Sequence, residues 1–199
     1  MRFHIGAVPK TESFDFPPGQ WNPLRHDFKS LVMLLFALPI GGVAFVIVGW
    51  LWLHETLAIK NLGNNPEALL VELLAVMFAL FPIHEFFHVV THPDFGMSRK
   101  TVLGVWPTRL LCYAHYDGVL SRNRFIVIFA MPLFVITIAP LFIAIISGHA
   151  SVLVAFLSSL NALGAGVDIF SIVILLWQVP SGAKVVNRGG QTYWNQPES

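Results

Sequence analysis

The stretch that decides the fold is ALLVELLAVMFALFPIHEFFHVV, residues 68–90. Three further stretches are as apolar: residues 31–53, 125–147 and 150–179, of which only the last holds a charge, Asp168. Each stretch can cross the hydrocarbon core of a bilayer, which is about 30 Å thick and needs about 20 helical residues. A soluble bundle would require polar outer faces, which residues 31–53 and 125–147 lack. We therefore predict an all-α polytopic membrane protein with four transmembrane helices.

The composition supports this class of protein. Of the 199 residues, 55% are hydrophobic and 12% are charged, whereas soluble chains carry about 25% charged residues. The net charge of +1 gives no basic field that would bind nucleic acid. Cys112 is the only cysteine, which excludes an internal disulfide and a cysteine-rich metal site. The first thirty residues are polar and rich in proline, so we see no cleavable signal peptide.

The basic residues predict the topology. All of them except Lys60 fall in residues 1–30, 92–124 and 180–199. Because basic residues accumulate on the cytoplasmic side, both termini are expected in the cytoplasm. The expected organisation is a cytoplasmic N-terminal tail at residues 1–30, a four-span core at residues 31–179 and a cytoplasmic C-terminal tail at residues 180–199.

The segment between the second and third spans has a different pattern. Apolar and β-branched residues alternate in residues 101–106 and 110–116, and Asp117-Gly118 follows as a turn signal. We predict a β-hairpin here, either on the cytoplasmic side or dipping into the bilayer surface.

A metal-binding pattern ends the second span. His84 and His88 are four residues apart and so share one helix face, where two imidazoles can bind one tetrahedral zinc ion. Glu85, between them, can act as general base toward a zinc-bound water. A helix end at which these side chains simply meet water is the alternative.

Asp168 is the predicted third ligand, because it is the only charge in the last span. Asn161 and Gly164 lie on the same helical face, seven and four residues earlier. Gly164 and Gly166 would let another helix approach closely. An aspartate that forms a hydrogen bond to another helix for packing is the alternative.

Other polar residues are possible ligands. His92 continues the face of His84 and His88, but Pro93 disfavours a helical conformation there. Glu72 lies about 18 Å before His84 along the helix, too far to bind the same ion. Loop residues that could fold back to the metal are Asp94, His115 and Asp117.

Together these residues resemble the site-2 protease class of intramembrane zinc metalloproteases. His84, Glu85 and His88 match the HExxH motif of that class, and Asn161 and Asp168 resemble its second motif, an asparagine followed by an aspartate ligand. That motif usually ends in Asp-Gly, whereas Ile169 follows the aspartate here.

The chain resembles more closely a group of small bacterial zincin membrane peptidases whose function is uncharacterised. The shared features are the HExxH span, the basic segment Ser121 to Phe125, the pair Ala139-Pro140 and a late aspartate after glycines, over roughly residues 68–178. The resemblance implies zinc-dependent peptide hydrolysis within or at the membrane, and a location in the bacterial inner membrane.

The leading hypothesis is an intramembrane zinc endopeptidase with one Zn²⁺ per chain. His84, His88 and Asp168 would bind the metal, Glu85 would activate the water, and Asn161 would donate a hydrogen bond to substrate or oxyanion. The expected partners are the lipid bilayer and a membrane protein or peptide substrate, which could pair with an edge strand of the hairpin. The alternatives are a non-catalytic metal-binding membrane protein and a small ion transporter.

Overall fold

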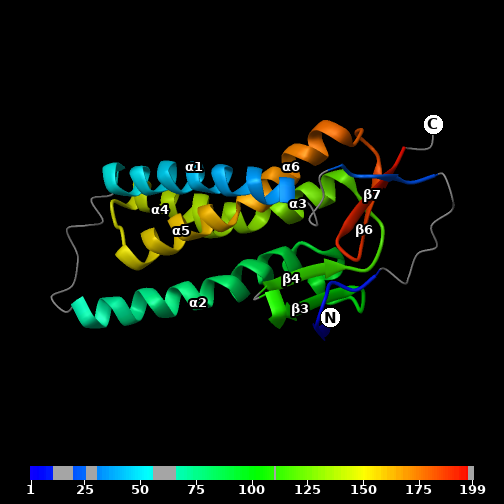
Figure 1. Cartoon of the computed structure of the whole chain (residues 1–199). Coiled ribbons are helices and arrows are strands. Elements are labelled where there is room, and N and C mark those ends of the chain that lie inside the picture. The colour runs from blue at the N-terminus through cyan, green and yellow to red at the C-terminus, as the bar shows by residue number, and fades with distance from the viewer. Residues whose placement is uncertain (11–19, 26–30, 56–65, 110, 197–199) are drawn as a thin grey trace.

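The computed structural model describes residues 1–10, 20–25, 31–55, 66–109 and 111–196, and most of them are helical (Figure 1). Helices α1 and α2 comprise Leu31–Glu55 and Pro66–Val90. A third long rod consists of α3 (Arg122–Pro132), the π-helix η4 (Leu133–Ile138) and α4 (Ala139–Ser147). The last two helices are α5 (Val152–Gly164) and α6 (Gly166–Gln178).

The helices have the length and composition of membrane spans. Within the described residues, three are long and apolar enough to cross a bilayer, and a fourth span results if α5 and α6 are counted as one. Their outer faces carry exposed large apolar side chains, for example Phe45, Trp50, Phe78 and Phe142. Such faces are stable in lipid and not in water, so several helices of the chain belong in a membrane.

The last span is bent, where the sequence predicted one continuous stretch. The axes of α5 and α6 differ by 45°, and the break falls between Gly164 and Gly166. Glycine is a weak helix former, and two glycines this close lower the cost of a break. Of the two, Gly166 is the close-approach position: a Cβ there would collide with the backbone of α1 at Ala37 and Gly41. A Cβ at Gly164 would meet no atom within 4 Å.

The predicted hairpin is present and gains a third strand. β3 (Thr101–Trp106) and β4 (Leu111–Tyr116) pair antiparallel. β1 (Arg2–Ile5), from the predicted N-terminal tail, pairs parallel with β3, so the sheet order is β1-β3-β4 and β4 is an edge strand. The side of the membrane on which this sheet lies remains a prediction.

The chain is mostly helical, as predicted, but it also contains a second sheet that the sequence did not predict. Its strands are β2 (Asn22–Pro23), β5 (Leu120–Ser121), β6 (Lys184–Arg188) and β7 (Gln191–Asn195), in the order β2-β7-β6-β5. The buried side chains of Leu120, Phe125, Leu175 and Val185 join this sheet to α3 and α6.

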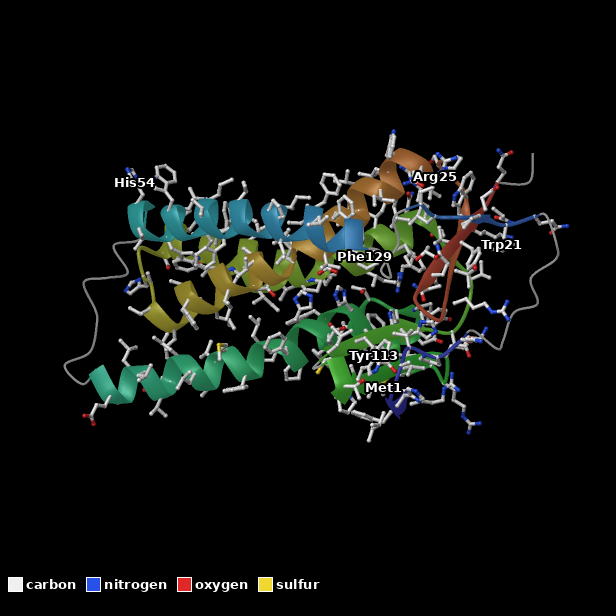
Figure 2. The ribbon with its side chains drawn as sticks, viewed as in Figure 1. Met1, Trp21, Arg25, His54, Tyr113 and Phe129 are labelled. Carbon is white, nitrogen blue, oxygen red and sulfur yellow. The ribbon has the colours of Figure 1, made fainter. Side chains whose placement is uncertain are left out.

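Both predicted tails therefore contribute strands to the fold, although residues 11–19, 26–30 and 197–199 lie outside the described part. The segment between the first two predicted spans, which contains Lys60, also lies outside the described residues. Figure 2 shows His54 at one end of the helical bundle, whereas Trp21 and Arg25 lie at the other end, near the sheets.

Candidate metal centre

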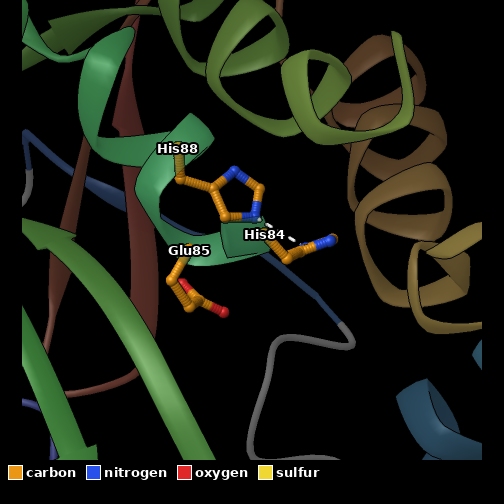
Figure 3. Close-up of side chains that lie close together, drawn as sticks. All are labelled: His84, Glu85 and His88. Carbon is orange, nitrogen blue, oxygen red and sulfur yellow. Dashed lines mark hydrogen bonds between the residues drawn. The ribbon is translucent and has the colours of Figure 1, made fainter. Parts of the chain in front are cut away.

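The last two turns of α2 bring three polar side chains together. His84, Glu85 and His88 each offer a ligand atom, and these atoms lie within 4.8 Å of one another. The two imidazoles share a face because four residues make about one helical turn. Figure 3 shows His84 and His88 beside each other, joined by a dashed line, with Glu85 close by on the same stretch of helix.

Asp168 joins the two histidines from the first turn of α6. Its Oδ2 lies 3.1 Å from Nε2 of His84 and 3.5 Å from Nε2 of His88. The two Nε2 atoms are 3.2 Å apart. The structure thus places the predicted third ligand beside the predicted pair, and α2 and the broken span meet at this point.

The other ring nitrogen of each histidine is held by a hydrogen bond. Nδ1 of His84 is 2.8 Å from Oδ1 of Asn161. Nδ1 of His88 is 2.8 Å from the carbonyl oxygen of Ile128 in α3. A carbonyl oxygen can only accept, so both Nδ1 atoms donate, and in a neutral imidazole the Nε2 atom then carries a lone pair.

These contacts make the centre a fit for a cation. Two Nε2 lone pairs and a carboxylate oxygen face one another at 3.1 to 3.5 Å. Oδ2 of Asp168 is buried, and the groups that face it are the two Nε2 atoms. Three electron-pair donors this close repel one another unless a positive charge lies between them. Two imidazoles and one carboxylate are a donor set that zinc prefers, and they leave one tetrahedral position open.

Glu85 occupies a different side of the centre. The backbone amide of Ala114 in β4 forms a hydrogen-bond contact with its carboxylate. Glu85 is half-buried, and its sequence position turns it about 100° around the helix from His84. Its carboxylate therefore lies close to the ligand atoms of His84 and His88, within 4.8 Å, and next to the edge strand of the sheet.

The rival ligands lie elsewhere. Nδ1 of His92 contacts the Thr101 hydroxyl at 3.3 Å, and Asp117 pairs with Arg2 at 3.1 Å. Asp94 is exposed in the turn after α2. Burial lowers the pKa of His92 to about 3 and that of His115 to about 4, with nearby positive groups contributing to both. Both rings are therefore neutral and are part of the packing of the three-stranded sheet.

Asn161 was predicted to face the substrate, but its hydrogen bonds in the structure lead elsewhere. Its Nδ2 donates to the Thr137 hydroxyl at 2.9 Å and to the Pro132 carbonyl at 3.2 Å, and its Oδ1 accepts from His84. The sequence reasoning missed Thr137 and the Ile128 carbonyl. For Thr137, the only signal in the sequence was a hydroxyl within the apolar stretch 125–147. The Ile128 carbonyl belongs to the backbone, so the sequence gives no signal for it.

The comparisons with known proteins agree with this centre. The model of a family described as "Putative zincin peptidase" matches residues 77–184, more than half of the chain. The chain belongs to this family. The match includes the complete His84–His88–Asp168 group and supports a zinc peptidase. No curated protein matches the chain, and no solved structure matches it.

Proposed function

We propose that the protein is a zinc-dependent endopeptidase of the site-2-protease-like type, which cleaves membrane-embedded or membrane-proximal substrates. The observation that carries this proposal is the convergence of three electron-pair donors on one point, from His84, His88 and Asp168, with the Glu85 carboxylate close beside the two histidines. A structural zinc site would be closed by a fourth protein ligand. Among the described residues the next such group is the Glu85 carboxylate, and we assign it to the attacking water rather than to the metal.

The residues divide the chemistry between them. His84, His88 and Asp168 would hold one Zn²⁺, which when bound polarises a carbonyl group and makes a water molecule more acidic. Glu85 accepts the proton of the attacking water and passes it to the leaving amine. The Asn161 amide bonds to His84, Thr137 and Pro132, so we assign it to holding His84 in place rather than to contact with substrate.

The hydrogen-bonding edge of β4 supplies a binding mode for the substrate. Peptide bonds in a transmembrane helix are shielded by their own hydrogen bonds, so the segment to be cleaved must unwind. An extended peptide can add to an exposed sheet edge through its main chain. β4 is an edge strand, and its residue Ala114 already contacts Glu85, so a peptide added there would lie beside the general base.

The orientation in the membrane follows from charge and exposure. We place both termini, the three-stranded sheet and the centre toward the cytoplasmic face of a bacterial inner membrane, because basic residues accumulate there. The sheet and the turn after α2 carry strongly exposed apolar side chains: Phe3, Ile5, Phe95 and Met97. Arg99 and Lys100 follow directly. This composition suits the boundary between acyl chains and anionic headgroups.

Glu85→Gln tests the proposal. The substitution keeps the shape of the side chain and removes its basicity, so zinc content should stay near one ion per chain. Cleavage of a reconstituted single-span substrate should fall by about 10²–10⁴-fold, the usual contribution of general base catalysis. Glu72→Gln is the matched control, because Glu72 is an exposed glutamate on the same helix. Cleavage by Glu85→Gln at the wild-type rate would refute the mechanism. A non-catalytic metal protein or an ion transporter predicts no cleavage by any of the three proteins.

A further inference from the structure

The geometry points to a buried hydrogen-bond relay, formed by Trp52, Ser158 and Thr137, that fixes the tautomer of His84 through Asn161. These three side chains are then positioning residues for the metal centre, although none of them touches it. The inference rests on the proposed function only in taking His84 as a metal ligand. The relay joins α1, α5 and η4 to the ligand-bearing end of α2.

The relay begins at α1. The indole Nε1 of Trp52 donates to the Ser158 hydroxyl at 2.9 Å. The Ser158 hydroxyl donates to the Thr137 carbonyl at 3.2 Å, and the Thr137 hydroxyl donates to the Ser158 carbonyl at 3.0 Å. The two residues therefore form a reciprocal pair between α5 and η4, in which each hydroxyl has used its only proton.

Because the Thr137 hydroxyl already donates its proton to Ser158, it determines the orientation of the Asn161 amide. A hydroxyl that donates elsewhere can only accept from a new partner, and the Pro132 carbonyl can also only accept. The side of the amide that faces both groups must therefore be the NH₂ side, as the distances of 2.9 and 3.2 Å show. The amide oxygen is left pointing at His84, at 2.8 Å from Nδ1.

The orientation of Asn161 in turn decides the tautomer of His84. An amide oxygen accepts and does not donate, so Nδ1 of His84 must carry the proton. Nε2 then presents its lone pair to the point shared with His88 and Asp168. A flipped amide would present NH₂ to Nδ1, favour the other tautomer and put a proton where a metal ion has to bind.

The local backbone supports this reading. η4 is a π-helix, in which the N–H of Ala139 bonds to the carbonyl of Phe134, five residues back. Such wide turns are rare and are frequent at functional sites. The side chains of Asn161, Thr137 and Ser158 are 0%, 1% and 0% exposed. Polar groups so deep in an apolar bundle are costly unless all their hydrogen bonds are made, and apolar residues would pack here without that requirement.

The experiment compares three variants of the full-length protein in detergent. Thr137→Val removes the acceptor, and Thr137→Ser restores it. Ser159→Ala is the control, because the hydroxyl of the neighbouring Ser159 donates to the Ala155 carbonyl of its own helix at 2.8 Å and, among the described residues, takes no part in the relay. The first readout is the zinc dissociation constant from chelator competition. The second is the ¹⁵N spectrum of His84 in the zinc-free protein, titrated to a pH at which the ring is neutral and assigned with a His84→Gln variant.

The expected result is a zinc dissociation constant about 10-fold higher or more for Thr137→Val, as for other residues that orient a ligand, and near the wild-type value for Thr137→Ser and Ser159→Ala. The His84 spectrum should show a single Nδ1–H tautomer in the wild type and a mixture in Thr137→Val. A wild-type zinc constant and a wild-type spectrum in Thr137→Val would overturn the inference. So would an equal loss of affinity in Thr137→Ser, since that would be a packing effect.

Neither readout needs peptide hydrolysis. If the wild type binds zinc and cleaves nothing, the proposed function fails and the relay stands. If the wild type binds no zinc, the tautomer of His84 still decides whether the relay exists.

Discussion

The two parts of α2 have different surroundings. In the first part, residues 67–83, most side chains face outward, and Phe78 is 69% exposed. In the last two turns, residues 84–90, His88 is only 7% exposed, and neighbours from α3, α6 and β4 surround the centre. The first part needs only lipid, since its side chains are as apolar as acyl chains. The second part needs specific partners.

This difference shows where the chain places charged and polar side chains that are unfavourable in an apolar environment. A charged side chain in the centre of a membrane costs about 2.5–3.5 kcal/mol on insertion scales. Asp168 and the end of α2 bring such groups together at one point, where the Asp168 oxygen lies 3.1 and 3.5 Å from the two imidazoles. Substitutions at the polar end of α2 should therefore have large effects and substitutions on its apolar part small ones.

The largest effect is expected from removing a ligand. Asp168→Asn keeps the shape of the side chain but takes away the charge that the two Nε2 atoms face. Purified protein should fall from about one zinc per chain to near none, because two ligands do not keep a tight tetrahedral site. Elemental analysis after dialysis against a weak chelator measures this.

Asp94→Asn is the control for that substitution, since Asp94 is exposed in the turn after α2 and asparagine tolerates its positive φ of 55°. Undiminished zinc in Asp168→Asn, or an equal loss in Asp94→Asn, would remove Asp168 from the centre and with it the pairing of α2 with α6.

The second effect concerns pH and the histidines beside the centre. Burial lowers the pKa of His115 to about 4, whereas an unfolded histidine titrates near 6.5. The folded state therefore keeps this ring neutral, and its contribution to stability is complete above about pH 6.5 and is lost as the pH falls toward 4. The slope between these values approaches about 1.4 kcal/mol per pH unit.

Thermal unfolding of the zinc-free protein between pH 7 and 5 should show this loss of stability. In His115→Gln the stability should fall less steeply with pH, because the contribution of one histidine is missing. His149→Gln, at an exposed position, should have the slope of the wild type. An unchanged slope in His115→Gln would show that His115 is not held neutral by the fold.

The third effect is smaller and concerns the support of the centre. Gly166→Ala places a Cβ against the backbone of Ala37 and Gly41, so α1 and α6 must separate. Overpacking of this kind costs about 1–3 kcal/mol, and it should also weaken zinc binding because Asp168 lies two residues further on. Gly164→Ala meets no atom within 4 Å and should be neutral or stabilising. A lower unfolding temperature in Gly164→Ala than in Gly166→Ala would contradict the observed packing.

The sequence was informative where the signal is local. Hydrophobic length predicts the long helices, and the four-residue spacing of His84 and His88 predicts a shared face because both depend on helix geometry alone. Asp168 could be selected because an isolated charge in an apolar span needs a partner.

Non-local pairing was beyond such reasoning. β1 pairs with β3 across about a hundred residues of chain, and nothing in Arg2–Ile5 indicates a partner. The orientation of Asn161 depends on Thr137 and Pro132, which come from another helix and become neighbours only in the folded bundle. The bend at Gly164 and Gly166 depends on the approach of α1, so the two glycines predicted close packing without showing which of them provides it.

The smallest effect is expected on the apolar part of α2. Phe78→Leu exchanges one lipid-facing apolar side chain for another, and both are favourable at the centre of a membrane helix. Unfolding temperature, zinc content and cleavage should stay close to the wild type, with a change in stability within about 0.5 kcal/mol. Phe125→Leu is the comparison, since Phe125 is buried in the cluster that joins α3 to the second sheet and contacts Phe129, and that substitution should cost more. If Phe78→Leu instead left zinc and stability unchanged but slowed cleavage several-fold, this part of α2 would contact the substrate as well as lipid. If it lowered stability as much as Phe125→Leu, the exposed face of α2 would be covered by another protein surface. The two parts of α2 would then differ in which protein groups they contact, and not in whether they face lipid or protein.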